Sequence, residues 1–157
     1  MKDETKPDSQ TKLNPATVAG ISIALYVLAC FLPALTFNDG NGLVDWPGYQ
    51  CLLMGILAPL VFQFAEFSNY LYFISLVLMM INKKRLAFWI SVIALVNSFN
   101  TFFLYFQNLP QNEGGVGAPL KFLYPQIGFY VWFGSMAVVT TGIALMIKRD
   151  AEKSVPK

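Results

Sequence analysis

The sequence predicts an all-α integral membrane protein, a bundle of four transmembrane helices with a short extra interfacial helix before the second span. Hydrophobic residues make up 55% of the 157 residues and charged residues only 13%, whereas an average soluble domain carries about 25% charged residues. Apolar stretches of roughly 20 residues, the length that crosses the hydrocarbon core, occur four times. Lys and Arg gather on one side of these stretches, which is typical of membrane proteins.

The first span is expected over residues 15–37. Asn14 is a suitable N-cap, and Pro15 stands at the helix position that tolerates proline best. The string that ends at Cys30 resembles the cleavage motif of a lipoprotein signal peptide, in which the Cys is lipidated. Apolar residues continue past Cys30, however, and acidic residues precede the span. We therefore expect the span to remain uncleaved, with a lipidated Cys30 as the alternative.

The second apolar stretch, residues 51–81, is too long for one straight span, since as a single helix it would measure roughly 46 Å. Pro59 divides it, and a proline inside a helix kinks or ends that helix. We expect a short helix over residues 48–58 in the outer interface, followed by a span over residues 60–82. A single tilted and kinked helix is the alternative.

The third span is expected over residues 86–106, directly after a basic triplet, and the fourth over residues 126–147, directly before Lys148 and Arg149. With the N-terminus in the cytoplasm, every Lys and Arg except Lys121 lies on the cytoplasmic side. This bias predicts a multi-pass protein of the cell inner (plasma) membrane with both termini cytoplasmic.

The segments outside the spans are expected to carry little structure. Residues 1–14 and 149–157 are predicted to be a disordered cytoplasmic tail and a cytoplasmic stub around a transmembrane domain of residues 15–148. The outer segments 38–47 and 107–121 are rich in Gly, Asn and Pro, which predicts turns and not folded domains.

The composition excludes several function classes. The chain has no His, which is the commonest general base and metal ligand, and it has no phosphate-binding loop or metal-ligand spacing. We therefore predict no catalytic residues, no metal and no cofactor. A net charge of +2 does not predict a nucleic-acid or nucleotide partner. The two cysteines, Cys30 and Cys51, are expected to be unlinked, with a disulfide as the alternative.

One polar cluster stands out inside the predicted spans. Glu66 is the only ionisable acid or base there, and a carboxylate in hydrocarbon is costly, so it should face the bundle and find partners. Counting 1.5 Å per residue from the inner ends places polar residues of three spans at a similar depth. The predicted cluster comprises Gln63, Glu66, Asn69, Tyr70, Asn97, Asn100, Thr101 and Ser135.

Two interpretations of this cluster remain open. It is either a hydrogen-bonded cluster that fixes the helix register with a protonated Glu66, or an ion, proton or substrate site. Small residues also line one face of the first span and one of the fourth, where they let helices approach closely. We expect the two faces to pack on each other, with self-association or a partner as the alternative: Ala16, Gly20 and Ala24; Gly134, Ala137, Thr141 and Ala144.

No motif in the sequence assigns an activity. The minimal loops and the absence of a catalytic constellation favour a small non-enzymatic accessory or assembly subunit that acts in the lipid bilayer through a membrane-protein partner or self-association. A related alternative is an immunity protein against a membrane-active toxin, by analogy of size and topology. The other alternative is an oligomeric transporter or channel component that uses Glu66 as a protonatable or cation site.

Overall fold

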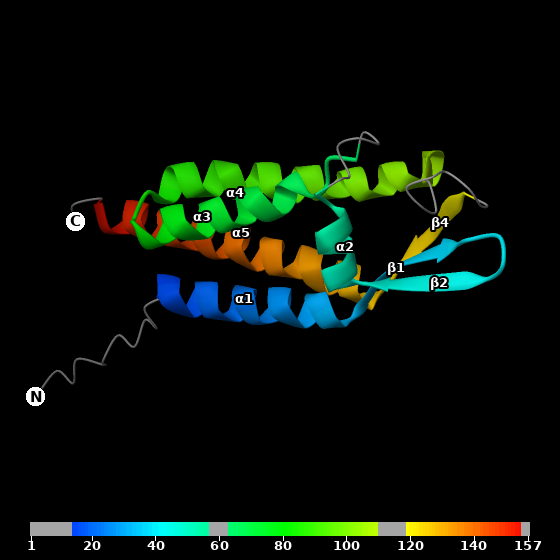
Figure 1. Ribbon diagram of the computed structural model, residues 1–157. Coiled ribbons are helices and arrows are strands. Elements are labelled where there is room, and N and C mark those ends of the chain that lie inside the picture. The colour runs from blue at the N-terminus through cyan, green and yellow to red at the C-terminus, as the bar shows by residue number, and fades with distance from the viewer. Residues whose placement is uncertain (1–13, 57–62, 110–118, 155–157) are drawn as a thin grey trace, which may run out of the picture.

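The structure, a computed structural model, describes residues 14–56, 63–109 and 119–154 as a helical bundle with a small sheet at one end (Figure 1). The helices are α1 (Pro15–Phe31), α2 (Gly48–Met54), α3 (Phe67–Met80), α4 (Lys84–Ser98), the 3-10 helix η2 (Phe99–Phe106) and α5 (Ile127–Ser154). The strands are β1 (Pro33–Asn38), β2 (Leu43–Pro47), β3 (Asn108–Leu109) and β4 (Leu120–Pro125).

The bundle is organised around α5. Helix α1 packs against α5, α5 packs against α4, and α4 packs against α3. The first and last helices approach closely at Gly142, where a Cβ would lie 2.5 Å from Cγ1 of Val18. The bundle core is a single cluster of buried residues: Val18, Ala19, Tyr26, Tyr72, Leu76, Met79, Ala87, Met136, Val139, Ile143 and Met146.

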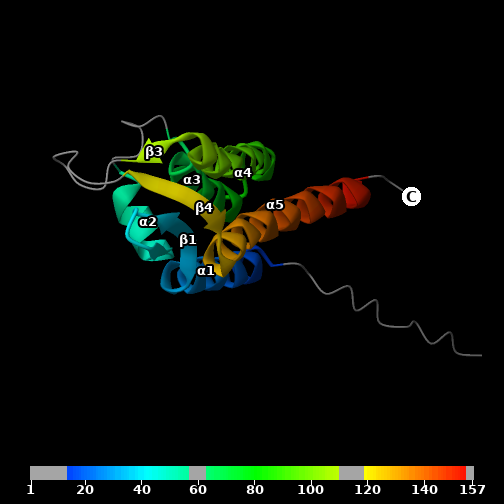
Figure 2. The same cartoon turned by 90° about the vertical axis from the view of Figure 1, so that its right-hand side faces the viewer.

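The sheet is antiparallel with the strand order β2-β1-β4-β3. Figure 2, in which the sheet faces the viewer, shows β1 and β4 lying across one end of the bundle. Phe37 of β1 is fully buried between Trp46 and Phe122, at ring-centroid distances of 4.8 and 5.7 Å. We call this region, β1 to β4 with η2, the sheet end. Its core is Ala34, Leu35, Phe37, Leu104, Leu120, Phe122 and Phe129.

The sheet was absent from the all-α prediction. Helix α1 ends at Phe31 and not at residue 37, because Leu32 is extended and precedes Pro33, a position where the helical conformation is sterically disfavoured. The residues that follow form β1, and residues 43–47, predicted as a turn, form β2. Segment 107–121 likewise contributes β3 and the start of β4, while its residues 110–118 lie outside the described ranges.

The second apolar stretch is broken, as Figure 1 shows. Helix α2 begins at Gly48, where the interfacial helix was predicted to begin, and it ends at Met54. The next described helix begins only at Phe67, and residues 63–66 are not helical. A single kinked helix over residues 51–81 is therefore wrong. Pro59 and the predicted start of the second span at residue 60 lie outside the described residues.

The C-terminal stub was predicted to carry little structure, whereas α5 continues through Ser154. Lys84 at the start of α4 binds Asp150 of this extension, with 2.6 Å between Nζ and Oδ2, so the extra turns are held against the bundle. By length and composition, the described helices that could cross a membrane are Lys84–Phe106 and Ile127–Lys153. The apolar helices α1 and α3 are shorter, so the four-span bundle stays a prediction.

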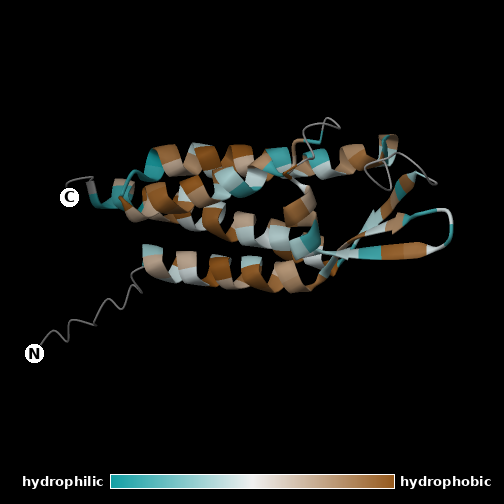
Figure 3. Cartoon of the chain, in the orientation of Figure 1, coloured by the Kyte–Doolittle hydropathy of each residue, from teal (hydrophilic) through white to brown (hydrophobic). Residues whose placement is uncertain are grey.

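Many apolar residues occur along the helices of the bundle (Figure 3), and many of the large ones are exposed. Among the described residues, every acidic or basic side chain except Glu66 lies either on the sheet end or at the opposite end of the bundle. Between these ends the surface consists of large exposed hydrophobic residues. We call them the apolar girdle: Ile21, Ile23, Val27, Leu28, Phe31, Phe67, Tyr70, Phe73, Ile74, Val77, Met80, Leu86, Trp89, Ile93, Val96, Ile127, Tyr130 and Leu145.

Candidate functional site

Glu66 stands at the N-cap position of α3, directly after the non-helical segment 63–65. Its half-buried carboxylate lies against the backbone of Gly55, the C-cap residue of α2. A Cβ at Gly55 would overlap this carboxylate. Glycine at position 55 therefore lets the end of α2 rest on the Glu66 side chain at the start of α3, whereas a larger residue would require that flexible side chain to move.

Asn69, one turn along α3, joins three helices. Its Oδ1 accepts a hydrogen bond from the Tyr26 hydroxyl of α1 at 3.0 Å and another from the Trp132 indole of α5 at 2.8 Å. Both bonds fix the orientation of the amide, so its NH2 group is the part that donates to the Glu66 carboxylate. Glu66 is thus connected to α1 and α5 through a single amide.

Ser22 of α1 forms a second connection between the same three helices. Its hydroxyl donates to the backbone oxygen of Ser135 at 2.7 Å and lies 2.7 Å from the Tyr72 hydroxyl. Because a serine hydroxyl donates only once, Tyr72 is the donor to Ser22. The Tyr72 ring stacks on Tyr26 with 5.2 Å between ring centroids. Ser135 also donates through its own hydroxyl to the Trp132 backbone oxygen at 2.6 Å.

Two asparagines of the α4 and η2 region hold the irregular backbone before α3. Asn97 donates to the backbone oxygen of Phe64 at 2.7 Å and to the Ser68 hydroxyl at 3.0 Å. Asn100 accepts from the Phe64 backbone N–H at 2.6 Å. An irregular backbone inside a bilayer requires such partners within the protein. Among the described residues, the side-chain nitrogen of the buried Gln63 has no hydrogen-bond partner, whereas its oxygen accepts from Ala65 N–H at 3.1 Å.

The structure therefore brings together only some of the residues of the predicted polar cluster. Glu66, Asn69 and Ser135 belong to one connected polar layer, and Asn97 and Asn100 bind the segment that leads into it. Thr101 is buried. Tyr70 does not belong to the layer, since its side chain is 53% exposed. Its predicted alignment with Gln63 assumed one continuous helix, and the helix begins only at Phe67.

Sequence reasoning missed the partners of this layer: Ser22, Tyr26, Tyr72, Trp132 and the contact at Gly55. No pattern in the sequence pairs the polar atoms of Tyr26 and Trp132 with Asn69, because these residues lie on other helices. A buried Tyr hydroxyl or Trp N–H usually finds a hydrogen-bond partner, which is the signal that could have found them.

The predicted packing of the small faces on each other is wrong for α1. Ala16, Gly20 and Ala24 are exposed, and a Cβ at Gly20 would meet no atom within 4 Å. Helix α1 instead contacts the bundle through the adjacent face that carries Val18 and Ser22, because these side chains fit Gly142 and the Ser135 backbone oxygen. On α5, Gly134 is similarly open, Ala137 and Ala144 are partly buried, and Thr141 is exposed.

The chemistry available near Glu66 is limited among the described residues. No group of three His, Cys, Asp or Glu side chains that could hold a metal ion is found there. Cys30 and Cys51 are free thiols. Burial, together with the nearby Glu66, raises the pKa of the Cys51 thiol to about 12, so this thiol stays protonated and unreactive at neutral pH. The arrangement can fix helices in place and can hold or release one proton at Glu66.

Comparison of the chain with protein-family models, with curated proteins and with solved structures gave no match. The function therefore has to be argued from the residues and their geometry.

Proposed function

We propose that the protein is a non-enzymatic accessory or assembly subunit of a membrane complex, which acts by contact with another membrane protein inside the bilayer. The observation that supports this proposal is the open face of α1. Ala16, Gly20 and Ala24 lie exposed among the large side chains of the apolar girdle. Small residues at such spacing let a second helix approach closely in lipid, where van der Waals packing drives association.

In this proposal the chain spans the inner membrane four times, with both termini in the cytoplasm. The apolar girdle and the location of the basic residues at the end opposite to the sheet support this orientation. Helix α1, of 17 residues, is about 26 Å long, and α3, of 14 residues, is about 21 Å long. The segment before α3 completes the second crossing, with its backbone bound by Asn97 and Asn100.

Glu66 acts in this proposal as a positioning residue. It holds the end of α2 against α3 and connects through Asn69 to α1 and α5. The second candidate function, an oligomeric transporter or channel component with Glu66 as a proton or cation site, is favoured by one observation. Within the described ranges, no salt bridge involves Glu66, so its charge is not neutralised by a base.

The decisive experiment is purification of a C-terminally tagged chain from its native membranes in mild detergent, with mass and composition measured together. A foreign membrane protein in fixed stoichiometry is the expected result. A lone monomer or a homo-oligomer would contradict the accessory role.

Two matched variants identify the contact face. Gly20→Leu should release the partner and leave the fold intact, because nothing lies within 4 Å of the added Cβ. Gly134→Leu, at an equally open glycine of α5, is the control and should retain the partner. Equal retention by both variants would remove the α1 face from the proposal.

Glu66→Gln separates the two candidate functions. Glutamine keeps the volume of the side chain and still accepts from Asn69, so a positioning role predicts unchanged partner yield and an unchanged melting temperature. A transport role predicts an intact fold with lost ion or proton movement in proteoliposomes. That second outcome would favour the transporter over the accessory subunit.

A further inference from the structure

One exposed face of α4 carries its side chains in a defined chemical order. Arg85, Trp89, Ile93 and Val96 follow an i, i+4, i+8, i+11 spacing, which places them in one stripe along the helix. Trp89 is 63%, Ile93 54% and Val96 64% exposed. From Arg85, the rise along the axis is about 6 Å to Trp89, about 12 Å to Ile93 and about 16 Å to Val96. The stripe therefore runs from a cation through an indole to aliphatic side chains.

The first turn of α4 leaves two cations available. Lys84 is bound to Asp150, and this ion pair ties the turn to α5. Its neighbours Lys83 and Arg85 are exposed, and neither side chain has a partner among the described residues. The described charges at this end of the bundle are predominantly positive: Lys83, Lys84, Arg85, Lys148, Arg149 and Lys153, against Asp150 and Glu152.

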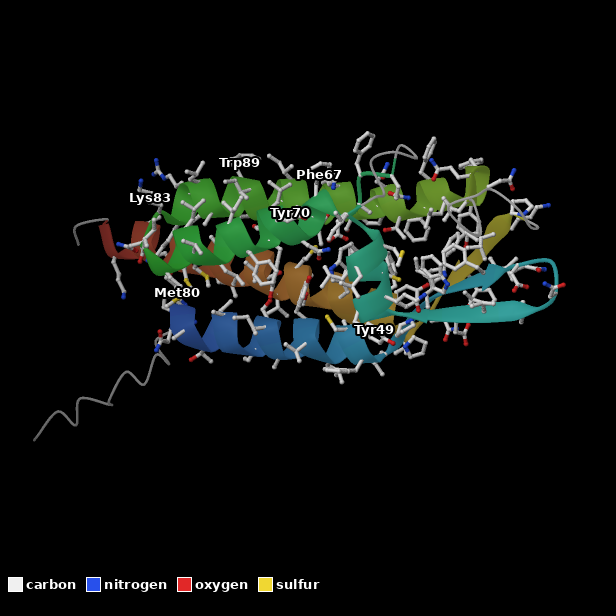
Figure 4. All side chains as sticks on the ribbon, viewed as in Figure 1. Tyr49, Phe67, Tyr70, Met80, Lys83 and Trp89 are labelled. Carbon is white, nitrogen blue, oxygen red and sulfur yellow. The ribbon has the colours of Figure 1, made fainter. Side chains whose placement is uncertain are left out.

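Within the described ranges, the indole N–H of Trp89 has no hydrogen-bond partner. Its ring packs edge-to-face on Phe88, with 5.5 Å between centroids. Figure 4 shows Trp89 on the outside of α4, with Lys83 nearer the end of the bundle that carries most of the cations. A tryptophan in this position is typical of the membrane interface, where the ring lies at the headgroup level and its N–H faces polar atoms.

We propose that this stripe is a binding site for an anionic phospholipid. The phosphate and the negatively charged headgroup bind Arg85, because a guanidinium forms paired hydrogen bonds with phosphate oxygens. The glycerol ester region lies at the Trp89 indole, and an acyl chain runs along Ile93 and Val96. The order of groups on α4 thus matches the order of groups along a phospholipid. The inference rests on the membrane placement in the proposed function, and it is independent of the partner protein.

Helix α5 provides an internal contrast. Its exposed cation Lys148 is followed toward the bundle centre by Leu145 and Thr141, which are also exposed and lie on the same helical face. This stripe has a cation and apolar surface but no aromatic residue at the headgroup level. Lys148→Gln is therefore a matched control, because it removes one cation from the same end of the bundle without touching α4.

The test measures binding of phosphatidylglycerol to the full chain in detergent by native mass spectrometry. Phosphatidylcholine, which has no net charge, is the comparison lipid. The wild-type chain should retain more phosphatidylglycerol than phosphatidylcholine. Arg85→Gln should weaken this binding about fivefold, the effect of about 1 kcal/mol per cation near an anionic lipid. Lys148→Gln should weaken this binding less than Arg85→Gln does, because Lys148 lies outside the stripe on α4. Trp89→Leu should reduce the preference for phosphatidylglycerol over phosphatidylcholine. Leucine keeps this position apolar, so the variant removes only the indole.

Equal retention of the two lipids, or equal losses in Arg85→Gln and Lys148→Gln, would overturn the site. Flotation with phosphatidylcholine vesicles separates this failure from a failure of the membrane placement. A chain that floats with neutral vesicles but shows no phosphatidylglycerol preference lacks the lipid site alone. A chain that does not float contradicts the proposed function as well.

Discussion

The bundle and the sheet end of this chain both contain an apolar core and differ in the side chains that surround it. In the bundle, the hydroxyls of Ser22, Ser68, Ser75, Ser98 and Ser135 are fully buried, while the apolar girdle lies outside. At the sheet end, an aromatic and aliphatic cluster around Phe37 is buried, and charged or amide side chains occupy the turn between β1 and β2. The two regions of the chain therefore differ in which side chains they bury and which they expose.

This difference indicates which forces stabilise each region. An apolar cluster gains free energy from leaving water, so the sheet end is stabilised by the hydrophobic effect. Its buried polar residue Thr36 donates to Asp45 at 2.7 Å and accepts from Gln126 at 2.5 Å. In lipid, apolar surface gains nothing from moving inward. Helices in lipid associate through close packing and hydrogen bonds, which is the pattern around Ser22 and Asn69.

The most destabilising substitution is expected in the core of the sheet end. Phe37→Ala removes a fully buried ring, and such a truncation costs about 3–5 kcal/mol of unfolding free energy. Leu43→Ala on β2, where the side chain is 65% exposed, is the control and should change it by less than about 0.5 kcal/mol. Denaturant unfolding in detergent micelles measures both. Similar effects for the two variants would mean that the sheet end is not stabilised by its apolar core.

The next effect tests the surface of the bundle. Ile93→Lys places a charge near the middle of the apolar segment Lys84–Phe106, and a lysine there costs about 2.5–3.5 kcal/mol of insertion free energy. Leu43→Lys on the sheet end should cost nothing comparable, because that surface faces water in the proposed topology. Glycosylation sites engineered on either side of the segment report the inserted fraction. Equal tolerance of both lysines would show that the girdle does not face lipid.

The smallest effect concerns the exposed ion pair at the cationic end. The hydrogen bond from Lys84 lowers the pKa of Asp150 below its usual 3.8. A lowered folded-state pKa contributes stability above the unfolded value, and this contribution is lost as the pH falls through the folded value. Asp150→Asn should therefore melt slightly below wild type at pH 7 and equally with it near pH 2, and the difference should shrink in high salt. A difference that persists at low pH would contradict the ion pair as its cause.

The sequence was informative about helices and weak about the sheet. Long apolar stretches and their basic flanks predicted segments close to α4 with η2 and α5, and Gly48 was predicted as the start of α2. The strands were missed because residues 33–37 continue the apolar stretch of α1, and apolar runs alone do not distinguish strand from helix. Pro33 was the available signal for the end of that helix.

Of the residues predicted for the candidate site, Glu66, Asn69 and Ser135 lie in the polar layer, and Asn97 and Asn100 bind the segment before α3. Glu66 and Asn69 were chosen because polar side chains are rare within apolar spans, and that argument depends only on composition. Tyr70 was placed incorrectly because its position depended on helical spacing across residues 63–66. Tyr26 and Trp132 were missed because their contacts with Asn69 join helices far apart in the chain, and no single-helix pattern records such contacts.

The position of β1 in the sheet sets an order for biosynthesis. Its neighbour β2 follows immediately in the chain, whereas its other neighbour, β4, is made only just before the last helix. While the ribosome is still translating the middle of the protein, one edge of β1 and one side of Phe37 have no partner. Completion of the sheet thus requires synthesis to reach β4, so a chain arrested or cut before residue 120 retains an unpaired strand edge that quality-control proteases can recognise.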